Sequence, residues 1–234
     1  MTHLLTARHK GLVACVAQAL VHLGSEGLLH PHDREQALAA VEEALTEVVG
    51  HVESENQLLH NPGPPPAPGA AHLRHDTLLE ECRIIRFSIA AIRASTQQNW
   101  PRVADVLYNS LAKLLSMLVT HTLEEQRQLR YAGVSVEAAA AADKNPADIR
   151  LAKDAVARNA GQALRWMASA CNLKEIAYVL QLIAAYGTRD DYRAAAEIIR
   201  ALSIPRRWEQ ISASLPQFAD TIPADLGASP PMRA

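Results

Sequence analysis

The sequence predicts an all-helical protein, and three observations support this fold class. Residues with high helix propensity, chiefly alanine, leucine, glutamate and arginine, abound in the 234-residue chain. Apolar residues recur at spacings of three and four, the period at which side chains share one face of an α-helix. No Asn-Gly or Asp-Gly pair separates alternating apolar and polar runs, as a tight β-hairpin would require.

Start and stop signals divide the first 133 residues into four helices. Gly24 ends the first helix and Pro31 precedes the second. The proline-rich stretch 62–69 interrupts the helical pattern, and Pro101 lies in the first turn of the fourth helix. Long helices with short connections predict an up-down-up-down four-helix bundle. The predicted helices cover approximately residues 4–23, 32–60, 71–95 and 100–132.

The rest of the chain predicts further helices and a tail. We expect residues 134–219 to form a C-terminal helical extension that packs on the bundle or on a partner. Residues 220–234 are rich in proline and alanine, and we predict that they are disordered. We expect the first domain, residues 1–133, to carry the functional site. The predicted C-terminal helices cover approximately residues 145–172, 173–186, 190–202 and 206–215.

All ten histidines lie between His3 and His121, so the two parts of the chain differ in chemistry. In the fourth helix, an apolar stripe at helical spacing leads to His121 and Glu125. In the second, a similar stripe leads to His51 and Glu55. Residues at i and i+4 lie on one face of a helix, one turn apart. Each helix therefore offers an imidazole and a carboxylate together.

Antiparallel connectivity brings these residues to one end of the bundle. His9 lies near the start of the first helix and His75 near the start of the third, whereas His51 and His121 lie near the ends of theirs. Imidazoles and carboxylates buried together in an apolar interior are costly without a compensating ion. Their chemistry suits Fe, Mn or Zn. The predicted metal ligands are His9, His51, Glu55, His75, His121 and Glu125.

This order of motifs resembles the hemerythrin-like, or HHE cation-binding, di-iron proteins, in the subset with four histidines and two glutamates. The resemblance covers about residues 4–130. It implies two Fe ions joined by an oxo or hydroxo bridge, with Mn or Zn as alternatives, and a small diatomic or peroxide ligand. The third helix offers His72 and His75 at a spacing of three, and the last carboxylate is Glu125. Both features differ from oxygen-carrying hemerythrins.

Three functions remain open at this point. The first is binding or reduction of O₂, NO or peroxide at a carboxylate-bridged di-metal site, with no separate catalytic residue and with enzymatic activity undecided. The second is iron sensing or donation, or iron-sulfur cluster repair. The third is a metal-free helical interaction module. The C-terminal helices are expected to mediate homo-oligomer or protein contacts.

Composition excludes several other classes. The net charge of −2 lacks the basic excess typical of nucleic-acid binding. No run approaches the ~18 consecutive apolar residues of a membrane span. The three cysteines are odd in number and far apart, which predicts a reducing compartment, and we expect a cytoplasmic protein.

Other polar residues near the motifs have simpler interpretations. We expect His22 on the surface, at the opposite end of its helix from the cluster, and His72 in a loop, although His72 is a possible seventh ligand. Glu124 is the alternative to Glu125, because i+3 also faces His121. Glu81 is expected to be solvated.

Overall fold

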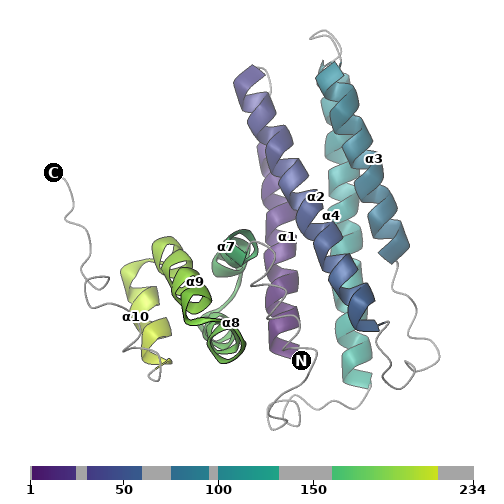
Figure 1. Cartoon of the computed structure of the whole chain (residues 1–234). Coiled ribbons are helices and arrows are strands. Elements are labelled where there is room, and N and C mark those ends of the chain that lie inside the picture. The colour runs from purple at the N-terminus through teal and green to yellow at the C-terminus, as the bar shows by residue number, and fades with distance from the viewer. Residues whose placement is uncertain (1, 25–30, 60–74, 95–99, 132–159, 216–234) are drawn as a thin grey trace, which may run out of the picture. The chain divides into compact units, whose positions relative to one another are not determined.

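The computed structural model describes residues 2–24, 31–59, 75–94, 100–131 and 160–215 (Figure 1). The prediction of an all-helical protein is confirmed for these residues, because they contain helices and no strand. The proline-rich stretch, His72, the first half of the helix expected at 145–172 and the tail 220–234 lie outside the described residues.

The four N-terminal helices agree closely with the predicted ranges. They are α1 Thr2–Gly24, α2 Pro31–Leu59, α3 His75–Ala94 and α4 Trp100–Tyr131. The four C-terminal helices are α7 Ala160–Ala170, α8 Leu173–Tyr186, α9 Arg189–Leu202 and α10 Pro205–Ala213.

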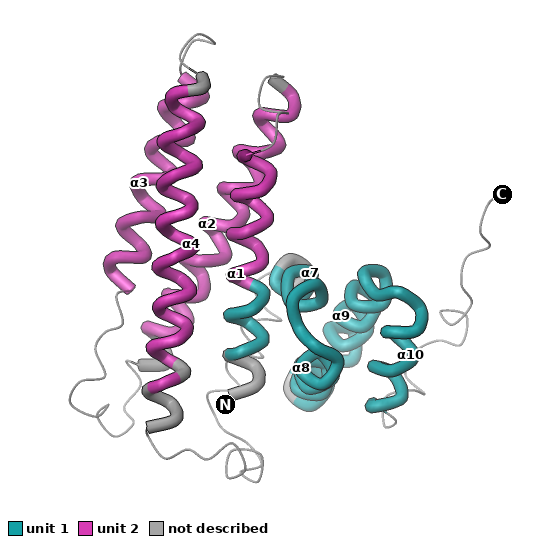
Figure 2. The backbone as a smooth tube through the Cα atoms, turned by 180° about the vertical axis from the view of Figure 1, so that it is seen from behind, with its two compact units in different colours: residues 1–11, 139–234 teal, residues 12–138 magenta. Residues whose placement is uncertain are grey.

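The chain separates into two compact units (Figure 2). Unit 1 comprises residues 1–11 and 139–234, and unit 2 comprises residues 12–138. The division falls inside α1, which is itself one unbroken helix. Unit 2 therefore contains α2, α3, α4 and most of α1.

Within unit 2, polar pairs show that α3 runs antiparallel to both of its neighbours. At one end of α3, His75 contacts Asn56 near the end of α2, and at the other end Arg93 binds Glu35 near the start of α2. The ring of His75 also lies 5.0 Å from that of His121, late in α4. Farther along α3, Glu81 pairs with Lys113, earlier in α4.

The apolar stripes that the sequence predicts in α2 and α4 form the core of unit 2. The residues of these stripes are fully buried and lie at the expected spacing of three and four. They are Val41, Leu45, Val48, Leu111, Leu114 and Leu118. The expectation that Glu81 is solvated is wrong, because Glu81 is buried and Lys113 provides its counter-charge. A surface lysine can reach inward in this way because its aliphatic stem is long.

In unit 1, two pairs of polar residues cap the starts of helices. Asn172 and Glu175 form a reciprocal capping box at the start of α8, and Thr188 and Asp191 form another at the start of α9. Such pairs satisfy backbone N–H groups that the first helical turn leaves without partners. The interior is apolar and includes Ile176, Leu180, Ile183, Ile199 and Ile211.

The first turns of α1 pack closely against α7 in unit 1. A Cβ atom at Gly11 would lie 3.0 Å from the backbone nitrogen of Met167. Glycine therefore permits the approach of the two helices. Beside it, Lys10 donates to the carboxylate of Glu175 at 2.7 Å, and the Cys171 thiol donates to the carbonyl of Ala7 at 3.4 Å.

One stretch of α4, Arg102–Glu125, is long and apolar enough to cross a membrane by length and composition. This is weak evidence, because the core helix of a soluble protein passes the same test. The stretch also contains the inward-facing His121.

Candidate metal centre

Three imidazoles from three helices converge on one buried carboxylate. Glu55 Oε1 lies 3.0 Å from His51 Nε2 on the same helix, α2. Glu55 Oε2 lies 3.1 Å from His75 Nε2 on α3 and 3.2 Å from His121 Nε2 on α4. All four residues are at most 5% exposed. A single carboxylate thus faces three ring nitrogens out of contact with bulk water.

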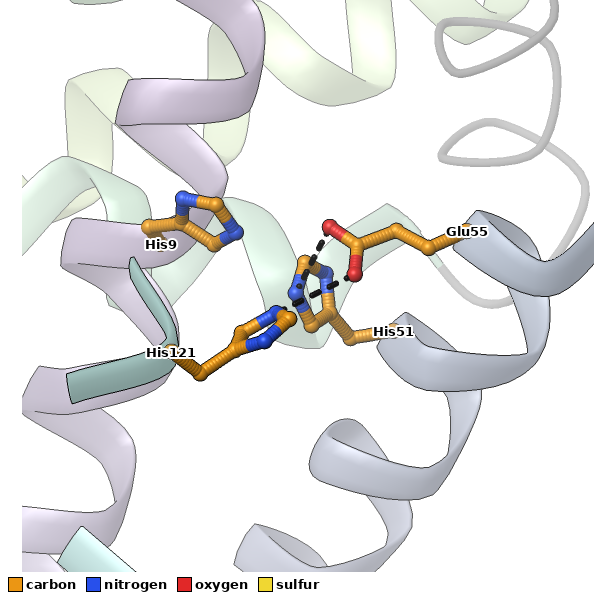
Figure 3. Close-up of side chains that lie close together, drawn as sticks. All are labelled: His9, His51, Glu55 and His121. Atoms are coloured by element: carbon orange, nitrogen blue, oxygen red, sulfur yellow. Dashed lines mark hydrogen bonds and ion pairs between the residues drawn. The ribbon is translucent and has the colours of Figure 1, made fainter. Parts of the chain in front are cut away.

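His9 extends this cluster from α1. His9, His51, Glu55 and His121 each offer one ligand atom, and these four atoms lie within 4.8 Å of one another. Figure 3 shows Glu55 pointing from its helix toward the imidazoles of His51 and His121, with His9 beside them. His9 precedes Leu12 by less than one turn of the unbroken helix α1. This buried group can hold a metal ion.

The helical period explains why α2 and α4 deliver their side chains to this point. Val48 and Leu118 are fully buried, and His51 and His121 follow them by three residues on the same helix faces. Glu55 lies one further turn along α2 and is also buried. The core stripe of each helix therefore continues without a break into the polar cluster.

The His75 ring has a defined orientation. Its Nδ1 atom lies 2.7 Å from the side-chain oxygen of Asn56, which can only accept a hydrogen bond. Nδ1 therefore carries the hydrogen, and in the neutral ring Nε2 presents a lone pair. That atom is buried, and it makes no hydrogen bond despite its closeness to Glu55.

A lone pair and a carboxylate oxygen repel each other at this distance unless a proton or a metal ion lies between them. A metal ion removes that repulsion, and imidazole with carboxylate is a donor set suited to Fe, Mn or Zn. The residues present therefore fit a transition metal.

Electrostatics favour the ionised form of Glu55. Burial by itself raises the pKa of this carboxyl, but the charge of His51 and hydrogen bonds from His121 and His51 together hold the pKa below its usual range. An ionised carboxylate is the form that binds metal. The surrounding histidines thus favour the ionised form of Glu55 although the carboxyl is buried.

Five of the six predicted ligands lie close together, and the sixth lies farther away. His9, His51, Glu55, His75 and His121 belong to the buried cluster. Glu125 lies farther out: its Oε2 atom is 4.0 Å from His121 Nε2, and its side chain is 16% exposed, against 6% for that of Glu55. Whether these residues act as ligands stays a prediction.

The expectation that His22 lies on the surface is confirmed. His22 is exposed and contacts Gln18 at 3.4 Å, and His32, at the start of α2, is also exposed and contacts Gln36 at 2.9 Å.

Sequence reasoning missed Asn56. Adjacent residues on a helix point about 100° apart, so the spacing that identified Glu55 excludes its neighbour from the same stripe. The available signal was its position near the end of α2, at the end of the molecule where the histidines gather.

Comparison of the chain with family models, with curated proteins and with solved structures found no match. The resemblance to hemerythrin-like proteins therefore depends on the residues themselves.

Proposed function

We propose that this chain is a non-haem di-iron protein, with α1–α4 arranged as a hemerythrin-like up-down-up-down bundle, and that it binds or reduces O₂, NO or peroxide. One observation carries the proposal: the buried Nε2 atom of His75 lies 3.1 Å from Glu55 Oε2 and makes no hydrogen bond. Burial of such a pair costs several kcal/mol without a cation. A bound metal removes that cost.

The donor set supports two ions rather than one. His9, His51, Glu55 and His121 supply four donors, which suffice for a single ion. His75 and Glu125 raise the number of donors to six. Glu55 presents one oxygen to His51 and the other to His75 and His121, so its two oxygens would be available to two ions held by different histidines.

The chain's own residues bind and orient the metal and exclude water. Each of α2, α3 and α4 has a fully buried apolar residue three positions from its histidine. These residues are Val48, Leu78 and Leu118. Iron held by these residues would supply electrons to a small ligand. The protein tunes that chemistry through its ligand set and through the hydrogen bonds made to it.

The first test is metal analysis of the full chain purified without chelator, followed by rapid mixing of the ferrous protein with O₂, NO or H₂O₂. We expect two irons per chain, a near-ultraviolet absorption band and oxidation that is fast on mixing. His51→Ala is expected to remove the iron, and the exposed His22→Ala serves as its control. A stable, colourless protein without metal, or one that holds a single zinc, would contradict the proposal.

A further inference from the structure

Asn56 joins the end of α2 to the first residue of α3. Its side-chain oxygen lies 2.7 Å from Nδ1 of His75, and this contact is partly buried. We infer that Asn56 is a positioning residue of the metal centre, which holds His75 in the tautomer and orientation that present Nε2 to the metal. The inference rests on the proposed function, since it assigns a role within the same site.

The chemistry of the two side chains supports this role. The Asn56 oxygen accepts a hydrogen bond and cannot donate one, so His75 Nδ1 carries the hydrogen. In a neutral imidazole the other nitrogen is then an acceptor or a metal ligand. That nitrogen is the buried Nε2 atom, 3.1 Å from Glu55 Oε2 and without hydrogen-bond geometry toward it.

The contact with Asn56 comes from a different helix. His51 and His121 lie inside α2 and α4. His75 is the first described residue of α3, and the oxygen beside its Nδ1 atom belongs to α2. A hydrogen bond from a metal-binding histidine to a neighbouring oxygen commonly fixes the ring and raises its basicity. Asn56 provides that oxygen from the adjacent helix.

The opposite orientation of the amide predicts a different chemistry. If the Asn56 nitrogen faced His75, it would donate to Nδ1, and the ring hydrogen would move to Nε2. His75 would then donate to Glu55 and could not bind metal. Asn56→Leu separates these cases, because loss of an acceptor at Nδ1 weakens metal binding, whereas loss of a donor there does not. Asn56→Asp keeps an acceptor at this position, because an ionised aspartate only accepts hydrogen bonds. Asn56→Leu removes both possibilities at nearly the same side-chain size.

The experiment uses the full chain titrated with Co²⁺, which has visible absorption and shifts the proton resonances of its ligands. Wild-type protein that binds no Co²⁺ would refute the proposed function and, with it, the inference. Given binding, we expect Asn56→Leu to weaken Co²⁺ affinity about 10- to 100-fold. Asn56→Asp is expected to bind at least as tightly as wild type. Asn109→Leu, at an exposed asparagine of α4, is expected to change nothing.

Paramagnetic proton NMR of the Co²⁺ protein distinguishes positioning from a purely structural role. We expect a shifted, solvent-exchangeable resonance from His75 Nδ1–H, identified by its absence in His75→Ala. It should persist in Asn56→Asp and disappear by rapid exchange in Asn56→Leu. If Asn56→Leu fails to fold, Asn56→Asp alone decides. Loss of affinity in Asn56→Asp, or wild-type affinity and an intact resonance in Asn56→Leu, would overturn the inference while leaving the metal site standing.

Discussion

The helices α2–α4 and α8–α10 differ in where they place their polar groups. In α8 and α9, capping boxes hold polar side chains at the helix starts, and the buried residues are mostly apolar. In α2–α4, the apolar core leads directly into three buried imidazoles and the carboxylate of Glu55.

The requirements of folding account for the first arrangement but not for the second. A cap satisfies backbone groups and stabilises a helix. Apolar residues of similar volume would stabilise the interior of α2–α4 at least as well as buried charged groups do. One end of α2–α4 is therefore the candidate functional site, and each prediction below compares the two regions.

The largest expected effect belongs to Glu55→Ala. This carboxylate faces all three imidazoles, so its removal is expected to weaken metal binding roughly 1,000-fold, or about 4 kcal/mol. Isothermal titration with Fe²⁺ or Co²⁺ under anaerobic conditions measures the change. Glu53→Ala, at an exposed position on the same helix, is the matched control and should bind as wild type does. Equal affinities for the two variants would refute the central role of Glu55.

Removal of metal should affect the two regions unequally. At a free metal concentration of 100 times Kd, binding stabilises the folded state by about 2.7 kcal/mol. A chelator is therefore expected to reduce hydrogen-exchange protection in α2–α4 near the cluster and to leave α8–α10 nearly unchanged. Mass spectrometry of peptides from both regions, with and without chelator, checks this. A uniform loss of protection would show that the regions do not differ in the predicted way.

A substitution at the start of α8 should lower stability without changing metal affinity. Asn172→Ala removes the side chain that accepts from the backbone nitrogen of Glu175 at 3.0 Å. The loss of such a cap costs about 1 kcal/mol of stability. Urea unfolding should report that loss, whereas metal affinity should stay at the wild-type value. A coupled fall in metal affinity would mean that α8 supports the site.

The smallest expected effect is a loss of stability at alkaline pH, and it should arise in both units. Burial raises the pKa of the Cys82 thiol to about 11 and that of Cys171 to about 12, from a usual value of 9.0. The folded state therefore holds these protons more tightly than the unfolded state. Stability is complete below pH 9 and falls as the pH rises toward those values.

Each thiol should contribute a loss of at most about 1 kcal/mol at pH 9.5. Urea unfolding at pH 8 and 9.5, for wild type, Cys82→Ala and Cys171→Ala, measures it. The alanine variants should show a smaller difference between the two pH values, and a difference equal to that of wild type would contradict the assignment.

The sequence predicts the helices well because each carries its own signals. Gly24, Pro31 and Pro101 lie within one or two residues of helix ends, and the apolar stripes are the observed core. The burial of His51, His75 and His121 near Glu55 also follows from spacing, because helical period and antiparallel order fix both the face and the end of the helix.

What the sequence does not predict depends on contacts between helices. Asn56 faces His75 from the adjacent helix, and the Lys113 side chain reaches the buried Glu81. Neither contact follows from the periodicity of a single helix. The sequence also does not predict that Glu125 lies farther from the histidines than Glu55 does, because each glutamate follows its histidine by four residues.

The most direct test is a crystal structure of the full chain loaded with iron, with anomalous diffraction recorded at the iron edge. The account predicts two anomalous peaks in the cluster, each about 2 Å from imidazole nitrogens of His51, His75, His121 or His9, with the Glu55 carboxylate between them. Absence of any peak among these side chains, or peaks only at the exposed His22 and His32, would contradict it.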